Sequence, residues 1–326
     1  MISRPQAPWA QVLAQHLERV DPALLRQSYA DLSARYRNQT FRGFFSKEER
    51  LAYMLARLPA TYAVNRAVLG HLDLQDASIL DLGCGPGAAS LAALAGGASR
   101  TTLVEQDGVM LDFAGQFCRA ADLEWDALLG AFEQIPFPDH DVVVASYVLN
   151  ELSEQAQAKI IARAWQAARQ ALVLIEPGTP QGFHHIRLHR EALIKMGAYM
   201  VAPCTHANTC PLATSDWCHF AARVPRTAAH RYLKEGDRGH EDEKYSFLIV
   251  SKQPLPVPEA RVIKPPRVRG GHVMLDLCAA EGLQTITIGK SQKATFRTAR
   301  KAAWGDGWPQ FEDDAHHESP LHPTGD

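Results

Sequence analysis

Residues 78–87 read SILDLGCGPG, and this stretch decides the fold. Its first five residues form a short apolar run that is typical of a buried β-strand, and three glycines follow at G-x-G-x-G spacing. Glycines let a backbone approach a ligand closely, and a helix that begins just after them presents free N–H groups. A dinucleotide site has G-x-G-x-x-G spacing instead. The stretch therefore predicts a strand, a ligand-binding turn and a helix.

Outward from this stretch, short apolar strands alternate with Ala-rich helices. The expected strands are residues 78–82, 101–105, 141–147, 171–176, 198–202 and 245–251. The expected helices are residues 87–95, 107–120, 153–170 and 183–196. Such alternation is typical of a parallel sheet that is covered by helices on both faces. The fold class is therefore α/β, with a Rossmann-like domain over residues 77–252.

Residues 1–76 are expected to form an N-terminal helical segment. Asp21-Pro22 offers an N-cap followed by proline at the first helical position. Residues 46–49, SKEE, form a capping-box pattern, and apolar residues recur at helical spacing over residues 51–58. Pro59 is expected to end that helix and to begin another.

The glycine-rich turn resembles the nucleoside-binding loop of class I S-adenosylmethionine-dependent methyltransferases. In that family an acidic residue at the end of the second strand holds the ribose hydroxyls, and Glu105 lies at the matching place, 24 residues after Asp81. By this resemblance Asp81 faces the methionine end of the cofactor, and the third-strand region at residues 128–133 contributes to the adenine site. Two carboxylates suit a cationic sulfonium ligand that carries no phosphate. The cofactor-binding residues that the resemblance implies are Asp81, Gly83, Gly85, Gly87, Glu105 and Phe132.

Residues 203–222 break the α/β pattern and carry three of the six cysteines. The spacing is Cys204-x5-Cys210-x7-Cys218, and Cys278 follows after 59 further residues. Thiolates are soft ligands that suit zinc or an iron–sulfur cluster, although the spacing is not the paired C-x2-C of zinc ribbons. We therefore expect a metal-binding insertion, with either metal still open, whose fourth ligand ties the C-terminal part of the chain to the main domain.

No catalytic signature stands where the methyltransferase sheet would place it. Cytosine-C5 methyltransferases use the cysteine of a Pro-Cys dipeptide after the fourth strand, but here that strand leads into residues 146–152, SYVLNEL, and Pro-Cys lies at residues 203–204. The Asn/Asp-Pro-Pro-aromatic loop of amine-methylating enzymes is missing as well. By position near the C-terminal edge of the sheet, the candidates for a catalytic group are Asn150, Glu151 and Glu176.

Charge is distributed unevenly although the net charge is only −2. Residues 1–221 carry −4, residues 222–301 carry +8 (16 Lys or Arg against 8 Asp or Glu), and residues 302–326 carry −6. The basic stretch indicates either a polyanionic partner or a solvated charged face.

Two C-terminal regions follow the main domain. Residues 253–304 are expected to form a basic, β-rich extension. Its β-type segments are residues 261–264, 271–278, 284–289 and 294–299. Residues 305–326 are expected to be an acidic, disordered tail.

Composition excludes several classes of protein. A chain with 46% hydrophobic and 21% charged residues is neither collagen-like nor fully disordered. Its longest apolar stretches, such as residues 142–149, run to about eight residues, whereas a bilayer span needs roughly eighteen. The N-terminus lacks the layout of a signal peptide. We therefore expect a cytoplasmic protein with no membrane partner; the sequence does not indicate its oligomeric state.

Together these motifs resemble the methyltransferase-like family of the small ribosomal subunit, as a bacterial relative of its mitochondrial members. The resemblance extends from about Leu51 to Trp304 and rests on DLGCGPG, SYVLNEL, LVLIEPGTPQGF, the PC…CP…WCHF segment, EKYSFLIV and a late LDLC. It implies a class I methyltransferase fold that binds S-adenosylmethionine and acts on the small ribosomal subunit or its rRNA. It also implies a [4Fe–4S] cluster on Cys204, Cys210, Cys218 and Cys278. Two other functions stay open: a catalytically inactive RNA-binding assembly factor, and a small-molecule methyltransferase with a structural zinc site.

Overall fold

A computed structural model describes residues 9–18, 20–38, 43–132, 134–213, 215–234 and 238–309. Most of the expected acidic tail, from residue 310 onward, lies outside the described residues. Within these ranges, no helix combines the length and the apolar character that crossing a bilayer would need.

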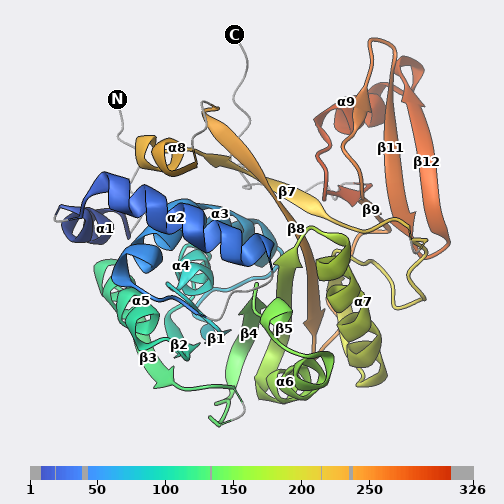
Figure 1. The fold of residues 1–326 in the computed structure, drawn as a ribbon. Coiled ribbons are helices and arrows are strands. Elements are labelled where there is room, and N and C mark those ends of the chain that lie inside the picture. The colour runs from blue at the N-terminus through green and yellow to red at the C-terminus, as the bar shows by residue number, and fades with distance from the viewer. Residues whose placement is uncertain are drawn as a thin grey trace.

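One large mixed sheet forms the body of the molecule (Figure 1). Its strand order is β3-β2-β1-β4-β5-β8-β6, and β7 pairs with β8 outside this path. Strands β1 to β5 run parallel, whereas β8 runs antiparallel to β5, β6 and β7. The strands are β1 (Ser78–Leu82), β2 (Arg100–Glu105), β3 (Glu124–Leu129), β4 (His140–Ser146), β5 (Ala168–Pro177), β6 (Tyr199–Ala202), β7 (Phe220–Pro225) and β8 (His240–Ser251). This strand order, with one reversed strand inserted next to the last, is that of the class I methyltransferase fold, so the predicted fold class is confirmed.

Helices cover both faces of the sheet, because its central strands are apolar on both sides. Ile79 of β1 packs with the helices α3 and α4, whereas Leu80 and Leu82 pack with α6 and α7 on the opposite face. The helices of the body are α3 (Lys47–Leu69), α4 (Ala88–Leu94), α5 (Gly108–Ala120), α6 (Glu154–Ala167) and α7 (Pro180–Lys195).

The N-terminal helices, in blue in Figure 1, are α1 (Trp9–Leu17), α2 (Pro22–Arg37) and α3. Helices α1 and α2 lie beside the body, and α2 packs against α3. The predicted caps are present: Asp21 accepts a hydrogen bond from Ala23 N, and Ser46 accepts one from Glu49 N. The prediction that Pro59 ends a helix is wrong, because α3 runs through it. Buried residues on both sides of Pro59, such as Leu58 and Val64, hold the helix against the core, and this packing offsets the missing hydrogen bond.

Strands β7 and β8 form a long hairpin that reaches over the N-terminal helices, with α8 (Ala228–Lys234) at its tip (Figure 1). The hairpin holds α3 through a bidentate ion pair, in which Arg57 donates to both carboxylate oxygens of Glu243 at 3.0 and 2.8 Å. The second half of β8 then enters the main sheet between β5 and β6. One strand therefore fixes both the N-terminal helices and the sheet.

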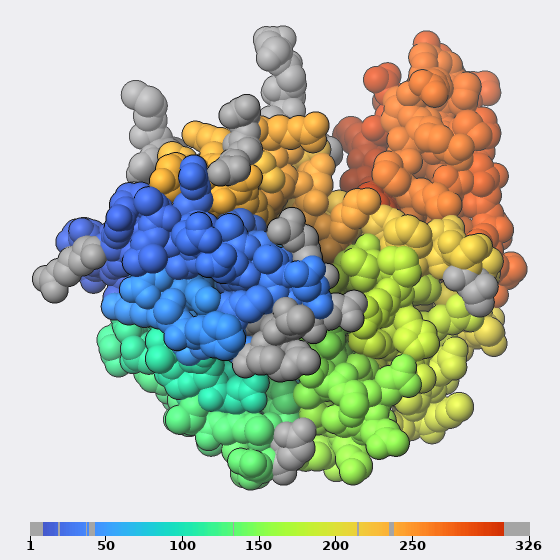
Figure 2. Space-filling model, in the orientation of Figure 1, coloured from blue at the N-terminus to red at the C-terminus, as the bar shows by residue number. Residues whose placement is uncertain are grey.

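Residues 260–309 form a separate lobe, red and orange in Figures 1 and 2. Its elements are β9 (Ala260–Val262), β10 (Arg267–Val268), β11 (His272–Ala279), β12 (Gly282–Gly289), the 3₁₀ turn η2 (Lys290–Gln292), α9 (Lys293–Lys301) and β13 (Gly307–Trp308). The prediction of a β-type segment at residues 294–299 is wrong, because these residues lie in α9. The helix forms because Phe296 and Ala299, three residues apart, are buried against the small sheet.

The lobe is attached to the body at the cysteine-bearing segment. Arg261 donates to Pro203 O at 3.0 Å, and Asn208 donates to Ala280 O at 3.1 Å. Cys278 lies near the end of β11 that faces this segment, since its Sγ is 3.9 Å from His206 Nε2. The cysteine-bearing segment therefore joins the two sheets.

Candidate functional site

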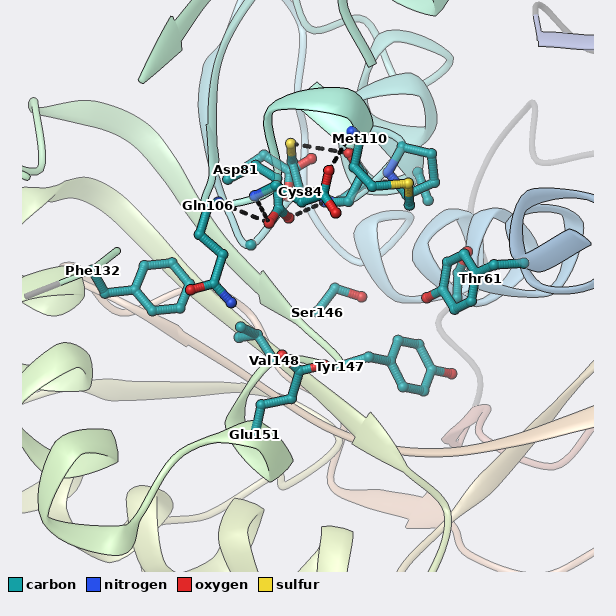
Figure 3. A pocket seen from close by; sticks show the side chains of 18 of the residues that line it. Thr61, Asp81, Cys84, Gln106, Met110, Phe132, Ser146, Tyr147, Val148 and Glu151 are labelled. Atoms are coloured by element: carbon teal, nitrogen blue, oxygen red, sulfur yellow. Dashed lines mark hydrogen bonds between the residues drawn. The ribbon is translucent and has the colours of Figure 1, made fainter. Parts of the chain in front are cut away.

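A cavity of ≈ 300 Å³ opens at the carboxyl ends of β1, β2 and β4 (Figure 3). This is where ligands bind in open α/β sheets. Of the residues predicted to bind the cofactor, the following five line it: Asp81, Gly83, Gly85, Glu105 and Phe132. The sixth, Gly87, instead lies at the N-cap of α4 with φ +79°.

Gly83 and Gly85 of the turn are glycines for different structural reasons. Gly83, at φ +65°, has no room for a side chain, because a Cβ there would lie 2.6 Å from Val148 Cγ2. Gly85, at φ +51°, faces the open cavity, since the nearest atom to a Cβ there would be Met110 Cε at 4.0 Å. The backbone at Gly85 is therefore exposed to whatever occupies the cavity.

Glu105 ties the glycine turn to the end of β2. Its Oε2 accepts a hydrogen bond from Gly85 N at 2.9 Å, and its Oε1 accepts from Gln106 N and Asp107 N at 2.8 and 3.0 Å. A carboxylate offers about four lone-pair positions, so these three bonds leave acceptor capacity for a ligand hydroxyl.

Asp81 lies beneath the turn and is almost completely buried. Its Oδ2 accepts hydrogen bonds from the backbone N and the Oγ of Ser90 on α4, at 3.1 and 2.8 Å. Burial raises the pKa of Asp81 to about 6, against the lowering effect of the Ser90 hydrogen bonds. Its carboxyl group therefore changes charge near neutral pH.

The sequence motifs missed Asn65 of α3, which lines the same cavity and is completely buried. Its Nδ2 donates to Thr61 O and to Ser146 Oγ, but its Oδ1 has no hydrogen-bond partner. A buried acceptor without a donor is costly, so an ammonium group in the cavity would satisfy it. With Asp81, Glu105 and the Gly85 backbone, this acceptor fits the ammonium and ribose groups of S-adenosylmethionine.

A second cavity, of ≈ 1110 Å³, adjoins the first between the N-terminal helices and the turn η1 (Leu149–Glu151). The two share several lining residues, among them Tyr36, Tyr53, Tyr147 and Glu151. The candidate Asn150 lines the larger cavity only. No motif indicated Tyr36 and Tyr53, because α2 and α3 are far in the sequence from the glycine turn, whereas Tyr147 belongs to the SYVLNEL stretch.

Glu151 projects into the cavities from η1, beside Val148 and Tyr147 (Figure 3). Its surface is open to the cavity, yet the surrounding protein desolvates it, and this effect, followed by the charges of Glu105 and Glu176, raises its pKa to about 7. Tyr147, at φ +61°, is in a backbone conformation that is rare for residues other than glycine. Such strain is typical of functional sites.

Glu176, the third candidate, lies behind this turn and lines neither cavity. It is fully buried, and its Oε1 accepts a hydrogen bond from Leu149 N at 3.0 Å. His185 Nδ1 of α7 lies 3.8 Å from its Oε2. Glu176 therefore positions the turn that carries Glu151.

The four cysteines of the predicted metal site come together around a small cavity of ≈ 40 Å³. They are free thiols, supplied by the 203–218 segment and by β11. Burial, and then the charges of the neighbouring thiols, raises the pKa of Cys218 and raises that of Cys278 to about 12. In the described part of the chain, no group of three or more His, Cys, Asp or Glu side chains is arranged to hold one metal ion.

Two buried arginines face these thiols. Arg190 of α7 donates to Cys204 Sγ at 3.3 Å and to the carbonyl oxygens of His206 and Asn208, and in the described residues it forms no ion pair with a carboxylate. Arg261 is equally buried. A buried cation requires a compensating negative charge. The donor set therefore fits a group that is held by thiolates and carries net negative charge.

Comparisons with known proteins give a family match over most of the chain. The family model described as "Mitochondrial small ribosomal subunit Rsm22" matches residues 47–309. The Rsm22-cox11 tandem proteins 1 and 2, mitochondrial, of Schizosaccharomyces pombe are each 26% identical over 358 aligned positions, which cover 88% of this chain and 46% of theirs. The chain thus spans about half the length of these curated relatives.

Solved structures with similar folds include two named methyltransferases. One is magnesium protoporphyrin IX methyltransferase from Synechocystis PCC 6803 with bound SAM, which is 14% identical to this chain, with a TM-score of 0.41. The aligned region covers 72% of this chain and 98% of that protein. The other is precorrin-6y C5,15-methyltransferase from Geobacter metallireducens GS-15, which is 18% identical, with a TM-score of 0.38. The aligned region covers 59% of this chain and 88% of that protein.

Proposed function

Because the chain belongs to the family of the mitochondrial small ribosomal subunit protein Rsm22, we propose that it is an S-adenosylmethionine-dependent methyltransferase that acts on the small ribosomal subunit or its rRNA. The observation that carries this proposal is the pair of adjoining cavities, one with the cofactor-binding glycine turn and one large enough for an acceptor. S-adenosylmethionine, when bound, supplies a methyl group on a positively charged sulfur. Titration calorimetry with the cofactor and its demethylated product, followed by methyl-transfer assays on small-subunit RNA, tests the two halves of the proposal.

Different residues of the cavity would bind different parts of the cofactor. The Gly85 backbone and Glu105 suit the ribose, because the carboxylate keeps acceptor capacity there. Asn65 Oδ1 and Asp81 suit the ammonium group, and Phe132 suits the adenine ring. The acceptor oxygens of Asn65 and Asp81 would thus bind the positively charged ammonium group of the cofactor.

The same proposal gives the four cysteines a [4Fe–4S] cluster, with zinc as the alternative. Cys204, Cys210, Cys218 and Cys278 would be its ligands, and the buried guanidinium groups of Arg190 and Arg261 would compensate its negative charge. Since Cys278 belongs to the C-terminal lobe, the cluster would fix that lobe to the body.

The RNA partner is supported by a row of cations on α9. Lys293, Arg297, Arg300 and Lys301 are exposed, recur at helical spacing beside the buried Phe296, and make no ion pair with a carboxylate in the described residues. This α9 stripe would also serve a catalytically inactive assembly factor that only docks on RNA. Methyl transfer by the purified protein separates the two functions.

Cofactor binding is expected to depend on pH through Asp81. Because burial raises the pKa of Asp81 to about 6, its carboxyl group is mostly neutral at pH 5 and mostly ionised at pH 7. The affinity for the cationic cofactor should therefore rise by up to about tenfold over this range. Calorimetry between pH 5 and 7.5 measures the rise, and Asp81→Asn should flatten it; an equal rise in that variant would assign the titration to another group.

RNA binding is expected to depend on salt through the α9 stripe. Each phosphate contact on single-stranded RNA contributes about 0.7 to the slope of log affinity against log salt concentration, because the contact releases counterions. Arg297→Gln should lower the slope by about that amount. Arg267→Gln is the matched control, because Arg267 is already paired with Asp276 at 2.9 Å and should change the slope less. Equal slopes for wild type and Arg297→Gln would show that the stripe does not contact RNA.

A further inference from the structure

We propose that the methyl acceptor is a nitrogen atom of a nucleobase extruded into the larger cavity, and that Glu151 accepts its proton. This inference rests on the proposed function and deepens it, because it names the acceptor atom class and the group that deprotonates it.

The larger cavity has the walls that a flat base requires. Tyr29 and Tyr36 come from α2, Tyr53 from α3, and Tyr147 from the turn after β4. Base–aromatic stacking is the common way in which proteins hold an unpaired base, and enzymes that modify bases extrude them into such pockets. The cavity of ≈ 1110 Å³ adjoins the cofactor cavity, so a base in it could reach a bound methyl donor.

The charge of the cavity favours the base over the phosphate backbone. Among its described lining residues the one cation is Arg57, which is neutralised by its bidentate ion pair with Glu243. Free cations are instead found on the α9 stripe, outside the cavity. Among the described lining residues a phosphate would meet no unpaired cation, whereas a neutral ring would lose little solvation.

The side chains favour nitrogen over carbon as the acceptor atom. Methylation at C5 of a pyrimidine requires a thiolate to add to the ring, and no cysteine lines the larger cavity in the described part of the chain. Cys84 lies on the cofactor side, where its Sγ donates to Gly85 O at 3.4 Å. Glu151, by contrast, lines both cavities.

The methyl transfer requires no reactant beyond the cofactor, the base, Glu151 and water. The nitrogen lone pair forms the new N–C bond, the C–S bond of the sulfonium breaks, and its electron pair stays on sulfur. The N–H proton passes to the carboxylate of Glu151, and water removes it afterwards. A carboxyl group with a pKa of about 7 suits this role, because about half of it is ionised at pH 7 and the carboxylate is basic enough to take a proton.

The groups that set the ionisation of Glu151 come from several elements. The charged and titratable residues around it are Glu105 (β2), Glu176 (β5), Tyr36 (α2), and Tyr53 and Arg57 (α3). The two carboxylates raise the pKa of Glu151. The rate should therefore rise with pH up to about 7 and then level.

The test uses the full-length, metal-loaded protein with S-adenosylmethionine and small-subunit RNA, and identifies the product nucleoside by mass spectrometry. We expect an N-methylated base. Glu151→Gln should lower the rate by about a hundredfold or more and abolish the rise with pH, while calorimetry still detects the demethylated cofactor. Glu154→Gln, an exposed carboxylate on α6 three residues away, is the matched control and should behave as wild type.

A second variant tests the stacking wall. Tyr36→Leu should raise KM for RNA about tenfold with a smaller effect on kcat, and Tyr36→Phe, which keeps the ring, should restore KM. A methyl group on a base carbon, on a ribose oxygen or on a ribosomal protein would overturn this inference while leaving a functional methyltransferase. Intact cofactor and RNA binding without any methyl product would overturn both this inference and the enzymatic half of the proposed function.

Discussion

Replacing Gly85 with leucine is expected to abolish measurable binding of S-adenosylmethionine. A Cβ at Gly85 points into the cofactor cavity, with Met110 Cε the nearest atom at 4.0 Å, so a larger side chain would occupy the space of the ligand. We expect an affinity loss of at least about a hundredfold, or about 2.7 kcal/mol. Titration calorimetry measures the loss directly.

A control variant distinguishes the effect of backbone strain on stability from the effect of a filled cavity on cofactor affinity. Gly85 has φ +51°, so leucine there also strains the turn by about 1–2 kcal/mol. Gly197, at the end of α7, has φ +82° and nothing within 4 Å of its Cβ position. Gly197→Leu should therefore lower the melting temperature to a similar degree without changing cofactor affinity. Unchanged affinity in Gly85→Leu would place the ligand elsewhere.

Replacing any one of Cys204, Cys210, Cys218 or Cys278 with alanine is expected to remove the bound cluster and destabilise the protein. Wild type purified without oxygen should be brown, with broad visible absorption that dithionite bleaches, and should contain iron. A metal site with several ligands contributes folding free energy, so each variant should melt about 10 °C lower or more. Metal analysis, absorption and calorimetric melting are the measurements.

Cys118→Ala is the matched control for these variants. Cys118 is equally a thiol but is buried in the helix α5 among Leu103, Leu111 and Leu123, away from the cluster cavity. Its replacement should keep the colour and the iron. Stoichiometric zinc without iron in the anaerobic wild type would contradict the cluster and support the zinc alternative.

Local patterns in the sequence predicted the parts of the site that follow from local backbone chemistry. The strand before Gly83 and the glycine turn are contiguous in the sequence. The caps at Asp21 and Ser46 were predicted for the same reason, because capping involves residues within three positions of each other. Glu105 lies 20 residues after Gly85 and was predicted by the family resemblance; its Oε2 accepts a hydrogen bond from Gly85 N.

The parts that could not be predicted depend on contacts between distant segments. Asn65 and Tyr53 belong to α3, and they reach the cavity through its packing against α4 and the sheet and its ion pair with the β7–β8 hairpin. The Thr and Phe residues of α9 are typical of a β-strand, but burial of Phe296 and Ala299 on one face favours a helix. Tertiary packing likewise outweighs the helix-breaking tendency of Pro59.

The position of β8 also has a consequence for synthesis of the chain. This strand lies between β5 and β6 but is made after both, and its last residue is Ser251. Until it emerges from the ribosome, β6 has no partner in the sheet, β5 has an open edge, and α3 lacks its ion pair with Glu243. A nascent chain that ends before residue 240 would therefore expose an aggregation-prone strand edge, and its helix α3 would lack the ion pair to the hairpin. Translation past Ser251 is thus the point at which the main sheet can first be completed.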